Sequence, residues 1–438
     1  MRALIFWSII IPIFLWTITN PFVGVLSYSI LNLVRPEMFF WGGGAGAKSL
    51  IVLFGASLIG VIFAFKNLRN EDETGKIICR EIVLWAFIYF AFLMLMPFSN
   101  YDVEYSYRYV HEIGKNSLFV FLLFLTLTSF KKIVQYEIGL LCALTFLGLW
   151  GIEQHFGGNV RLEGLGGDSW GDSNGVAAIF VLFAPVALSF TEKCHTKMVR
   201  IFAVISFVIM LCLIVFTESR GGFLGLVIVL CVYWLKSQKK VSLLLVALVV
   251  ALLALPLVSQ EYWDRIETIG GDSETGERGA SSNSRLVFWE CGLMLFVENP
   301  FTGVGFGAFP EAKLQYASYF DYLDEMFVDE FFRADIPYVT HSTYIQILSE
   351  GGLLVIVPFL LIIFLTLYSN WRIRSSTPRT AGNTKYLSLL NGIDIGILGY
   401  CVCIVFINSI VFIFFPVQTI VCSKIRQQLL LADDAKHE

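Results

Sequence analysis

A polar segment, 217–222, separates two long apolar runs and contains Glu218, Ser219 and Arg220. An arginine at the edge of an apolar run is costly unless it is paired or hydrated, which makes it a functional candidate by default. Arg220 is therefore a candidate functional residue, with Glu218 and Ser219 beside it. The alternative is an interfacial arginine that snorkels or pairs with Glu218.

A histidine stands where a long polar segment returns to an apolar run. His341 is flanked by hydroxyl-bearing residues, and Tyr344 follows closely. A neutral imidazole can accept a proton from an alcohol near pH 7. His341 is thus a candidate general base. A hydrogen-bonded interfacial histidine is the alternative.

Two further segments between apolar runs carry candidate functional residues: the stretch that begins at Arg285 and the segment 154–174. Arg285 opens a stretch of helical spacing, where a cation is electrostatically unfavoured unless it is solvated or faces an anion. Arg161, Asp172 and Asn174 stand in the glycine-rich segment 154–174, whose composition favours tight turns. That segment is either a plain turn or a polar lid beside the other candidates.

Neither a metal site nor a nucleotide site is apparent in the sequence. No cluster of histidine, cysteine and carboxylate residues has metal-ligand spacing. The glycine-rich stretch 299–307 lacks the lysine and hydroxyl residue of a phosphate-binding loop, so we interpret it as a turn packed closely on a helix. We expect no cofactor. The formal net charge of −4 gives no indication of a nucleic-acid partner.

The composition indicates that membrane-spanning helices position these residues. The 438 residues are 56% hydrophobic and 15% charged, whereas soluble domains carry roughly 25% charged residues. The apolar runs are long enough to cross a bilayer, and spanning segments of this kind are helices. The predicted fold class is all-α: a polytopic membrane protein of about 12 transmembrane helices with a large, partly helical periplasmic loop. The expected spans are 48–65, 81–98, 117–130, 136–153, 175–190, 200–216, 223–235, 241–258, 351–370, 386–405 and 409–423, after one or two N-terminal crossings.

Clusters of lysine and arginine predict the orientation, because cytoplasmic loops are enriched in them. The segments between these clusters are then outside: 99–116, 154–174, 217–222 and 259–350. At the N-terminus Asn20-Pro21 breaks an apolar stretch, and we favour one net crossing there, which gives about 12 helices and not 13. We expect no cleaved signal peptide, because no small-residue cleavage site follows the first apolar run.

Three regions follow from this topology. Residues 1–258 form a transmembrane bundle, 259–342 a large periplasmic loop, and 343–438 further spans with a cytoplasmic tail. The loop holds 15 acidic and 5 basic residues.

The order of these motifs resembles the O-antigen ligase and polymerase superfamily of bacterial membrane glycosyltransferases. The resemblance is carried by 218–222, by Ser284, Arg285 and Trp289, by 299–305, and by the string His341-Ser342-x-Tyr344-x-Gln346-x-x-x-Glu350-x-Gly352. Residues 20–25, Lys115 and 172–174 also resemble the O-glycosylation ligases encoded beside exosortase systems. Ser173 departs from that branch, where asparagine is expected.

The resemblance implies transfer of a glycan from undecaprenyl pyrophosphate to an acceptor hydroxyl at the periplasmic face of the inner membrane. His341 would be the base, while Arg220 and Arg285 would stabilise the leaving pyrophosphate and Arg161 its second phosphate. Such arginines replace a metal ion, and direct displacement inverts the anomeric centre. The acceptor would be lipid A-core, protein or another glycan. The implied substrate-binding residues are Arg161, Glu218, Ser219, Asp172, Asn174, Lys115 and Tyr344.

Three other functions remain open at this point. A polysaccharide polymerase of the same superfamily would use the same arginines with a lipid-linked glycan as acceptor. A transporter of lipid-linked sugars is disfavoured because the polar groups gather at one face, whereas transporters bind near the midplane. An assembly factor would instead depend on the acidic residues 272–277.

Overall fold

A computed structural model gives the fold of the chain. It describes residues 2–36, 44–72, 78–96, 101, 103–159, 162–165, 172–192, 194–236, 277–320, 322–323, 325–333, 335–380, 382–410 and 412–434. These residues form helices and connections and contain no strand. The all-α prediction is therefore confirmed for this part of the chain.

The helices follow one another with mostly short connections. Their bounds are α1 (Arg2–Thr19), α2 (Pro21–Val34), α3 (Gly44–Glu71), α4 (Arg80–Leu95), α5 (Val103–Thr126), α6 (Phe130–Phe156), α8 (Ser173–Ser189), α9 (Lys197–Phe216), α10 (Arg220–Lys236), α13 (Glu277–Glu298), α14 (Phe309–Ala312), the 3-10 helix η4 (Lys313–Phe320), α15 (Glu325–Phe331), α16 (Thr343–Ser376), α17 (Thr384–Cys403) and α18 (Phe414–Asp434).

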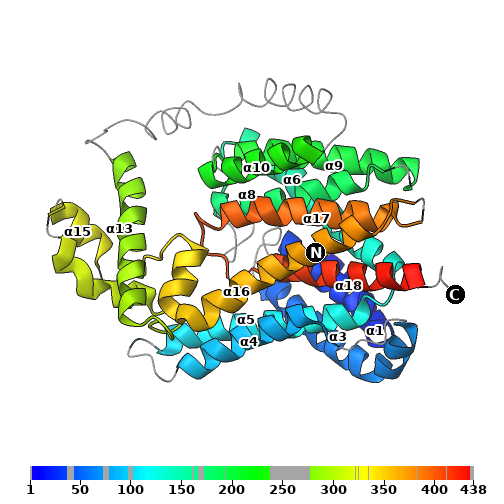
Figure 1. Ribbon diagram of the computed structural model, residues 1–438, viewed down its shortest axis with the longest axis horizontal. Coiled ribbons are helices and arrows are strands. Elements are labelled where there is room, and N and C mark those ends of the chain that lie inside the picture. The colour runs from blue at the N-terminus through cyan, green and yellow to red at the C-terminus, as the bar shows by residue number, and fades with distance from the viewer. Residues whose placement is uncertain are drawn as a thin grey trace.

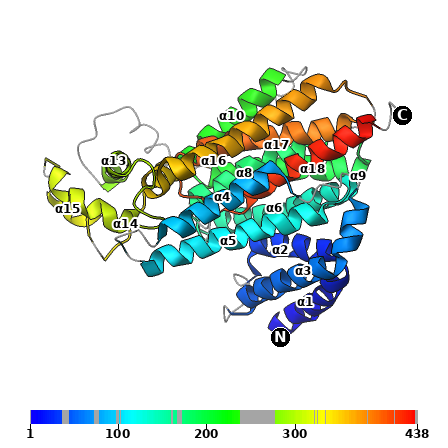
Figure 2. The ribbon, with the colours of Figure 1, turned by 60° about the horizontal axis from the view of Figure 1, so that its bottom comes forward.

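Most of the helices form one elongated bundle with their axes roughly along its length (Figure 1). In Figure 2, α1, α2 and α3 lie together along one side, and α2 packs between α3 and α6. Helices α13, α14 and α15 project from one end of the bundle in both views. The C-terminus lies at the opposite end.

The helices agree well with the predicted spans. Ten of the eleven expected segments after the N-terminus coincide with helices, and 241–258 lies outside the described residues. Among the described residues, 5 helices are long and apolar enough to cross a membrane, and three shorter apolar helices accompany them. Several membrane-spanning helices are thus supported, while the total of about 12 stays a prediction.

The break predicted at Asn20-Pro21 is present. Asn20 has non-helical backbone angles between α1 and α2, and Pro21 is the first residue of α2. Proline suits that position because its missing N–H would have no partner in the first turn.

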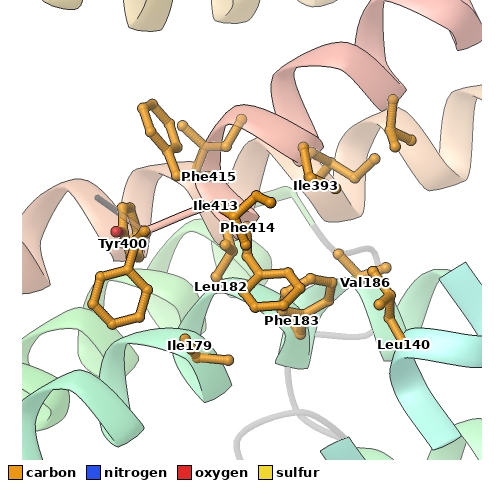
Figure 3. Close-up of a cluster of buried hydrophobic side chains, with 14 of the residues drawn as sticks. Leu140, Ile179, Leu182, Phe183, Val186, Ile393, Tyr400, Ile413, Phe414 and Phe415 are labelled. Atoms are coloured by element: carbon orange, nitrogen blue, oxygen red, sulfur yellow. The ribbon is translucent and has the colours of Figure 1, made fainter. Parts of the chain in front are cut away.

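Close backbone contacts hold the centre of the bundle together. A Cβ atom at Gly396 of α17 would lie only 2.0 Å from the Leu182 carbonyl oxygen of α8, so glycine is required there. Figure 3 shows the adjoining apolar cluster, in which Phe183 of α8 and Tyr400 of α17 face Phe414 and Phe415 at the start of α18. Because lipid tails are as apolar as leucine, association of such helices depends on this close packing.

The segments rich in lysine and arginine gather at the end of the bundle that holds the C-terminus. Four ion pairs join them: Lys132 with Glu71, Lys424 with Asp72, Arg426 with Glu81, and Arg374 with Asp394. The loops rich in lysine and arginine were predicted to lie on one side of the membrane, and their place at one end of the bundle agrees with that prediction. Which side of the membrane it faces stays a prediction.

The described part of the acidic segment has an apolar core of its own. Aromatic residues of α13, α14 and α15 pack together, including Phe288, Phe309 and Phe331. The fully buried Lys313 donates a hydrogen bond of 2.6 Å from Nζ to the Phe331 carbonyl oxygen, and its ammonium lies 5.5 Å from the centre of the Phe288 ring. This segment is therefore a small folded unit at the end of the bundle.

Candidate active site

Residues from α8 and from the α9–α10 connection form a hydrogen-bonded chain at the end opposite the ion pairs. The Ser219 hydroxyl donates to Asn174 Oδ1 at 2.7 Å and accepts the Gly222 N–H at 3.0 Å. Asn174 Nδ2 donates to Asp172 Oδ2 at 3.3 Å, and Asp172 caps α8 by accepting the Gly175 N–H at 3.0 Å. Three of the predicted substrate-binding residues are thus joined, although Ser219 is 45 positions from Asn174 in the sequence.

The glycines after Arg220 allow this connection to pack closely, because glycine has no side chain. A Cβ atom at Gly222 would lie 2.4 Å from Ala177 Cβ of α8, and one at Gly221 would lie 3.1 Å from the Phe406 ring. Arg220 is the first residue of α10 and is partly exposed, while Glu218 and Ser219 before it are buried. The connection that leads into Arg220 is therefore packed between α8 and Phe406 of the α17–α18 connection.

The segment that carries His341 is held by α13 and by the α17–α18 connection. Trp289 Nε1 of α13 donates to the Thr340 carbonyl oxygen at 3.0 Å. The Thr343 hydroxyl donates to the Ile407 carbonyl oxygen at 2.6 Å and accepts the Ser409 N–H at 2.9 Å. Both neighbours of the His341–Ser342 pair are therefore bonded to other elements, which holds the backbone that carries the imidazole.

The electrostatic surroundings of His341 bring three predicted residues together. The pKa of His341 is lowered to about 4: burial lowers it most, the positive charge of Arg285 also lowers it, and the carboxylate of Asp172 opposes both effects. An imidazole with this pKa is neutral at physiological pH and can accept a proton. Arg285 and Asp172 act on the ring through space, so α8, α13 and the start of α16 contribute to one site.

Two of the site residues have strained backbones. Glu218 and His341 both have φ of 50°, in the left-handed region that favours glycine. Such a conformation costs of order 1–3 kcal/mol and collects at functional sites, where the surrounding structure enforces it. Among the described non-glycine residues, Arg35 alone shares this property.

The glycine-rich stretch 299–307 packs on α16, as expected. The Val304 and Gly305 N–H groups donate to the carbonyl oxygens of Ser349 and Glu350 at 2.9 and 3.0 Å. The Glu350 carboxylate in turn accepts the Phe309 N–H at 3.2 Å. Glu350 therefore holds residues 304–309 against α16, the helix that begins next to His341.

The position of Arg285 differs from the sequence-based expectation. Helix α13 begins at Glu277, so Arg285 lies inside the helix and not at its first turn. The glycine and serines of 279–284 are tolerated because helix interiors accept them at a small cost. The argument from a helix N-terminus therefore does not apply to Arg285, whose relevance comes from its effect on the pKa of His341.

Three predicted residues lie elsewhere or are not described. Tyr344 donates from its hydroxyl to the Cys401 carbonyl oxygen at 3.0 Å and lines an apolar groove of about 590 Å³ between α10 and α17. Lys115 lies in a different cavity and forms an ion pair with Glu112 at 2.5 Å. Arg161 lies outside the described residues. The neighbouring Leu162 and Leu165 are buried against α6 and α9, which fixes that part of the predicted polar lid.

The α17–α18 connection is a contributor that sequence reasoning missed. Asn408 Oδ1 lies 3.0 Å from the Thr340 hydroxyl, and Ser409 shares a hydrogen bond with Thr343. Two polar residues between apolar runs were the available signal, but their partners are remote in the sequence. No group of three or more His, Cys, Asp and Glu residues able to hold a metal ion occurs within the described ranges.

Comparison with known proteins gives one family. Residues 205–360 match the family model described as O-antigen ligase. The matched segment is less than half of the chain, but it contains Glu218, Arg220, Arg285 and His341. No curated protein matches the chain.

Proposed function

We propose that this chain, whose residues 205–360 match the O-antigen ligase family, is a membrane glycosyltransferase that uses undecaprenyl pyrophosphate as its glycan donor. It would transfer the glycan to an acceptor hydroxyl at the periplasmic face of the bacterial inner membrane. The observation that carries the proposal is His341, buried within the electrostatic reach of Arg285 and Asp172 on a backbone segment that Trp289 holds in place.

The chemical step follows from these residues. His341 accepts the proton of the acceptor hydroxyl while the hydroxyl oxygen forms a bond to the anomeric carbon of the glycan. The bond from that carbon to the phosphate oxygen breaks, and the electron pair leaves with undecaprenyl pyrophosphate. Direct displacement inverts the anomeric centre. Asp172 favours the imidazolium that forms, because its negative charge raises the pKa of His341.

The arginines supply the charge that the leaving group requires. Negative charge develops on the pyrophosphate in the transition state, and positioned guanidinium groups stabilise it through charge-assisted hydrogen bonds. Arg220 stands at the start of α10 and Arg285 is near His341, so both are suited to this role. Transfer would then need no metal ion.

An apolar groove offers a place for the isoprenoid tail. It lies between α10 and α17, with Leu224, Val227 and Phe406 among its lining residues. Phe406 also contacts Gly221, the residue after Arg220. A donor with its pyrophosphate at Arg220 would therefore have its tail enter the groove without crossing polar surface.

Product analysis tests the proposal. Purified protein would be incubated with a short glycan on undecaprenyl pyrophosphate and with lipid A-core, a candidate protein or a second lipid-linked glycan as acceptor, all in EDTA. Glycan on lipid A-core or protein supports a ligase, whereas a longer lipid-linked chain assigns a polymerase. Absence of product with every acceptor, despite donor binding, would contradict glycosyl transfer and favour transport.

A further inference from the structure

Helix α16 contains a break close to the candidate site. Gly352 has φ of 56° and ψ of −157°, so residues 343–351 form a short helical piece that is separate from the long remainder of the helix. His341 stands just before this piece. A break of this kind frees backbone N–H and C=O groups, which need other partners where they are buried. Those partners therefore show what holds the His341 end of α16 in place.

The connection between α13 and α14 supplies the partners. Residues 304–305 donate their N–H groups to carbonyl oxygens on the near side of the break. On the far side, Leu353 and Leu354 donate their N–H groups to the carbonyl oxygens of residues 300–301 at 2.8 and 3.1 Å. Residues 300–305 are thus inserted at the break and bond to both of its sides.

Two glycines allow this insertion. A Cβ atom at Gly303, which has φ of 60°, would lie 2.4 Å from the Glu350 carbonyl carbon. A Cβ atom at Gly352 would lie 2.5 Å from the Phe301 carbonyl carbon. A side chain at either position would therefore push the connection away from α16.

The Glu350 side chain provides a second attachment between the same segments. It is 1% exposed, and its carboxylate accepts hydrogen bonds from the Phe309 N–H at 3.2 Å and from the Gly307 N–H. A buried carboxylate is costly unless hydrogen bonds replace those it made to water. Since these donors are backbone groups of another segment, the carboxylate fixes where residues 307–309 lie relative to α16.

The attachment continues to the helix that carries Arg285. The Phe309 ring packs on the Phe288 ring of α13, with the ring centroids 6.3 Å apart. Phe288 lies about one helical turn after Arg285. Helix α13 also packs directly on the start of α16, where a Cβ atom at Gly292 would lie 2.4 Å from Ile345 Cγ2 (Figure 2). The carboxylate therefore joins the helix that follows the candidate base to the helix that carries the candidate arginine.

We propose that Glu350 is a positioning residue for the transfer reaction. Its carboxylate holds residues 307–309, and through Phe309 it keeps α13 and Arg285 in place relative to His341. This inference rests on the proposed function, in which Arg285 acts on the leaving pyrophosphate. Glu350 acts only through these contacts and takes no part in the chemical step.

Hydrogen exchange of the purified full chain tests the holding role without any transfer assay. Glu350→Ala should speed exchange of the 304–309 amides by about tenfold, because it removes the acceptor of two hydrogen bonds. Glu350→Gln keeps an acceptor oxygen and should have a smaller effect. Glu137→Ala is the matched control, since Glu137 is another fully buried carboxylate, on α6, and it accepts a hydrogen bond from Gln418 of α18. The control should leave these amides unchanged, and unchanged exchange in Glu350→Ala would overturn the proposal.

The pH dependence of transfer separates positioning from a purely structural role. Arg285 lowers the pKa of His341, whereas Asp172 raises it. Displacement of α13 weakens the effect of Arg285, so Glu350→Ala should move the acidic limb of kcat/KM to higher pH. It should also lower kcat by about 10–100-fold, as misplacement of a reacting group does. Loss of the Glu350 negative charge alone would move the limb the other way. In an Arg285→Gln background, Glu350→Ala should cause no further shift of the limb.

Gly303→Ala displaces the same connection by another route, so the test does not depend on folding of the Glu350 variants. It should reproduce both the faster exchange and the shift of the limb. Faster exchange with an unchanged limb in both variants would make Glu350 a structural residue and overturn the positioning role. Absence of transfer by the wild type would instead contradict the proposed function, while the exchange rates would still decide whether Glu350 holds the two helices together.

Discussion

The two ends of the helical bundle differ in how they hold their charged residues. At the end with the C-terminus, buried charges are paired: Arg426 contacts Glu81 and Asn370, and Lys424 contacts Asp72. At the other end, Glu218 and His341 are strained, and the charge of Arg285 acts against protonation of His341.

The contrast distinguishes charged residues that stabilise the fold from charged residues that we propose to act on the substrate. Removing two charges from water is costly, so buried pairs persist where each ion compensates the other. The candidate site instead combines cationic residues with strained backbone, a combination that collects at functional sites. Changes at one end should therefore affect stability, and changes at the other should affect transfer.

The largest expected effect is at the proposed base. His341→Ala should lower transfer by about 10²–10⁴-fold, the range that general acid–base groups contribute. His155 provides a control histidine, because it lies at the same end of the bundle and stacks on Phe216 of α9. Initial rates of purified, monodisperse protein are the measurement. Equal rates for the two alanine variants would remove His341 from the mechanism.

At the opposite end, Arg426→Gln should destabilise the protein by up to about 3–5 kcal/mol, because it leaves the buried Glu81 carboxylate with the half-exposed Arg80 as its remaining cation. Thermal unfolding in detergent measures the loss, and Glu81→Gln combined with Arg426→Gln should recover part of it. Transfer per folded molecule should stay at the wild-type level. A loss of transfer comparable with that of His341→Ala would contradict the division between the two ends.

The pH dependence of transfer should change in a direction set by Arg285. His341 acts in its neutral form, and its pKa is lowered to about 4, so kcat/KM should be constant near neutrality and fall below that pKa. Arg285→Gln removes a charge that lowers the pKa, so the acidic limb should move to higher pH. Asp172→Asn removes a charge that raises it, so the limb should move lower. Identical limbs in all three proteins would exclude His341 as the titrating base.

A smaller effect is expected from Ser219→Ala. This change removes the hydroxyl that accepts the Gly222 N–H and contacts Asn174. Loss of such a helix-capping group costs about 1 kcal/mol. Transfer should fall only a few-fold, and a Ser219→Thr variant should restore it. A loss as large as that of His341→Ala would give Ser219 a direct chemical role.

Local sequence features predicted most of the fold and part of the site. Apolar runs and the Asn20-Pro21 break predicted helix positions, because membrane helices satisfy their own backbone groups. Arg220 and His341 stood out because they are polar residues beside long apolar runs. The start of α13 was missed, since small polar residues give no periodic signal. The link from Thr340 to Asn408 and the cavity at Lys115 depend on segments that meet only in the folded chain.

The most direct test of the account compares Arg220→Ala with Arg372→Ala in metal-free transfer from a lipid pyrophosphate donor. Arg372 is an exposed arginine on the other end of the bundle, and its change should leave transfer and thermal stability unchanged. Arg220→Ala should lower transfer by about 10²–10³-fold without changing stability, as expected for a group that stabilises developing negative charge. Wild-type transfer rates for Arg220→Ala would contradict the assignment of this end of the bundle as a glycosyl-transfer site.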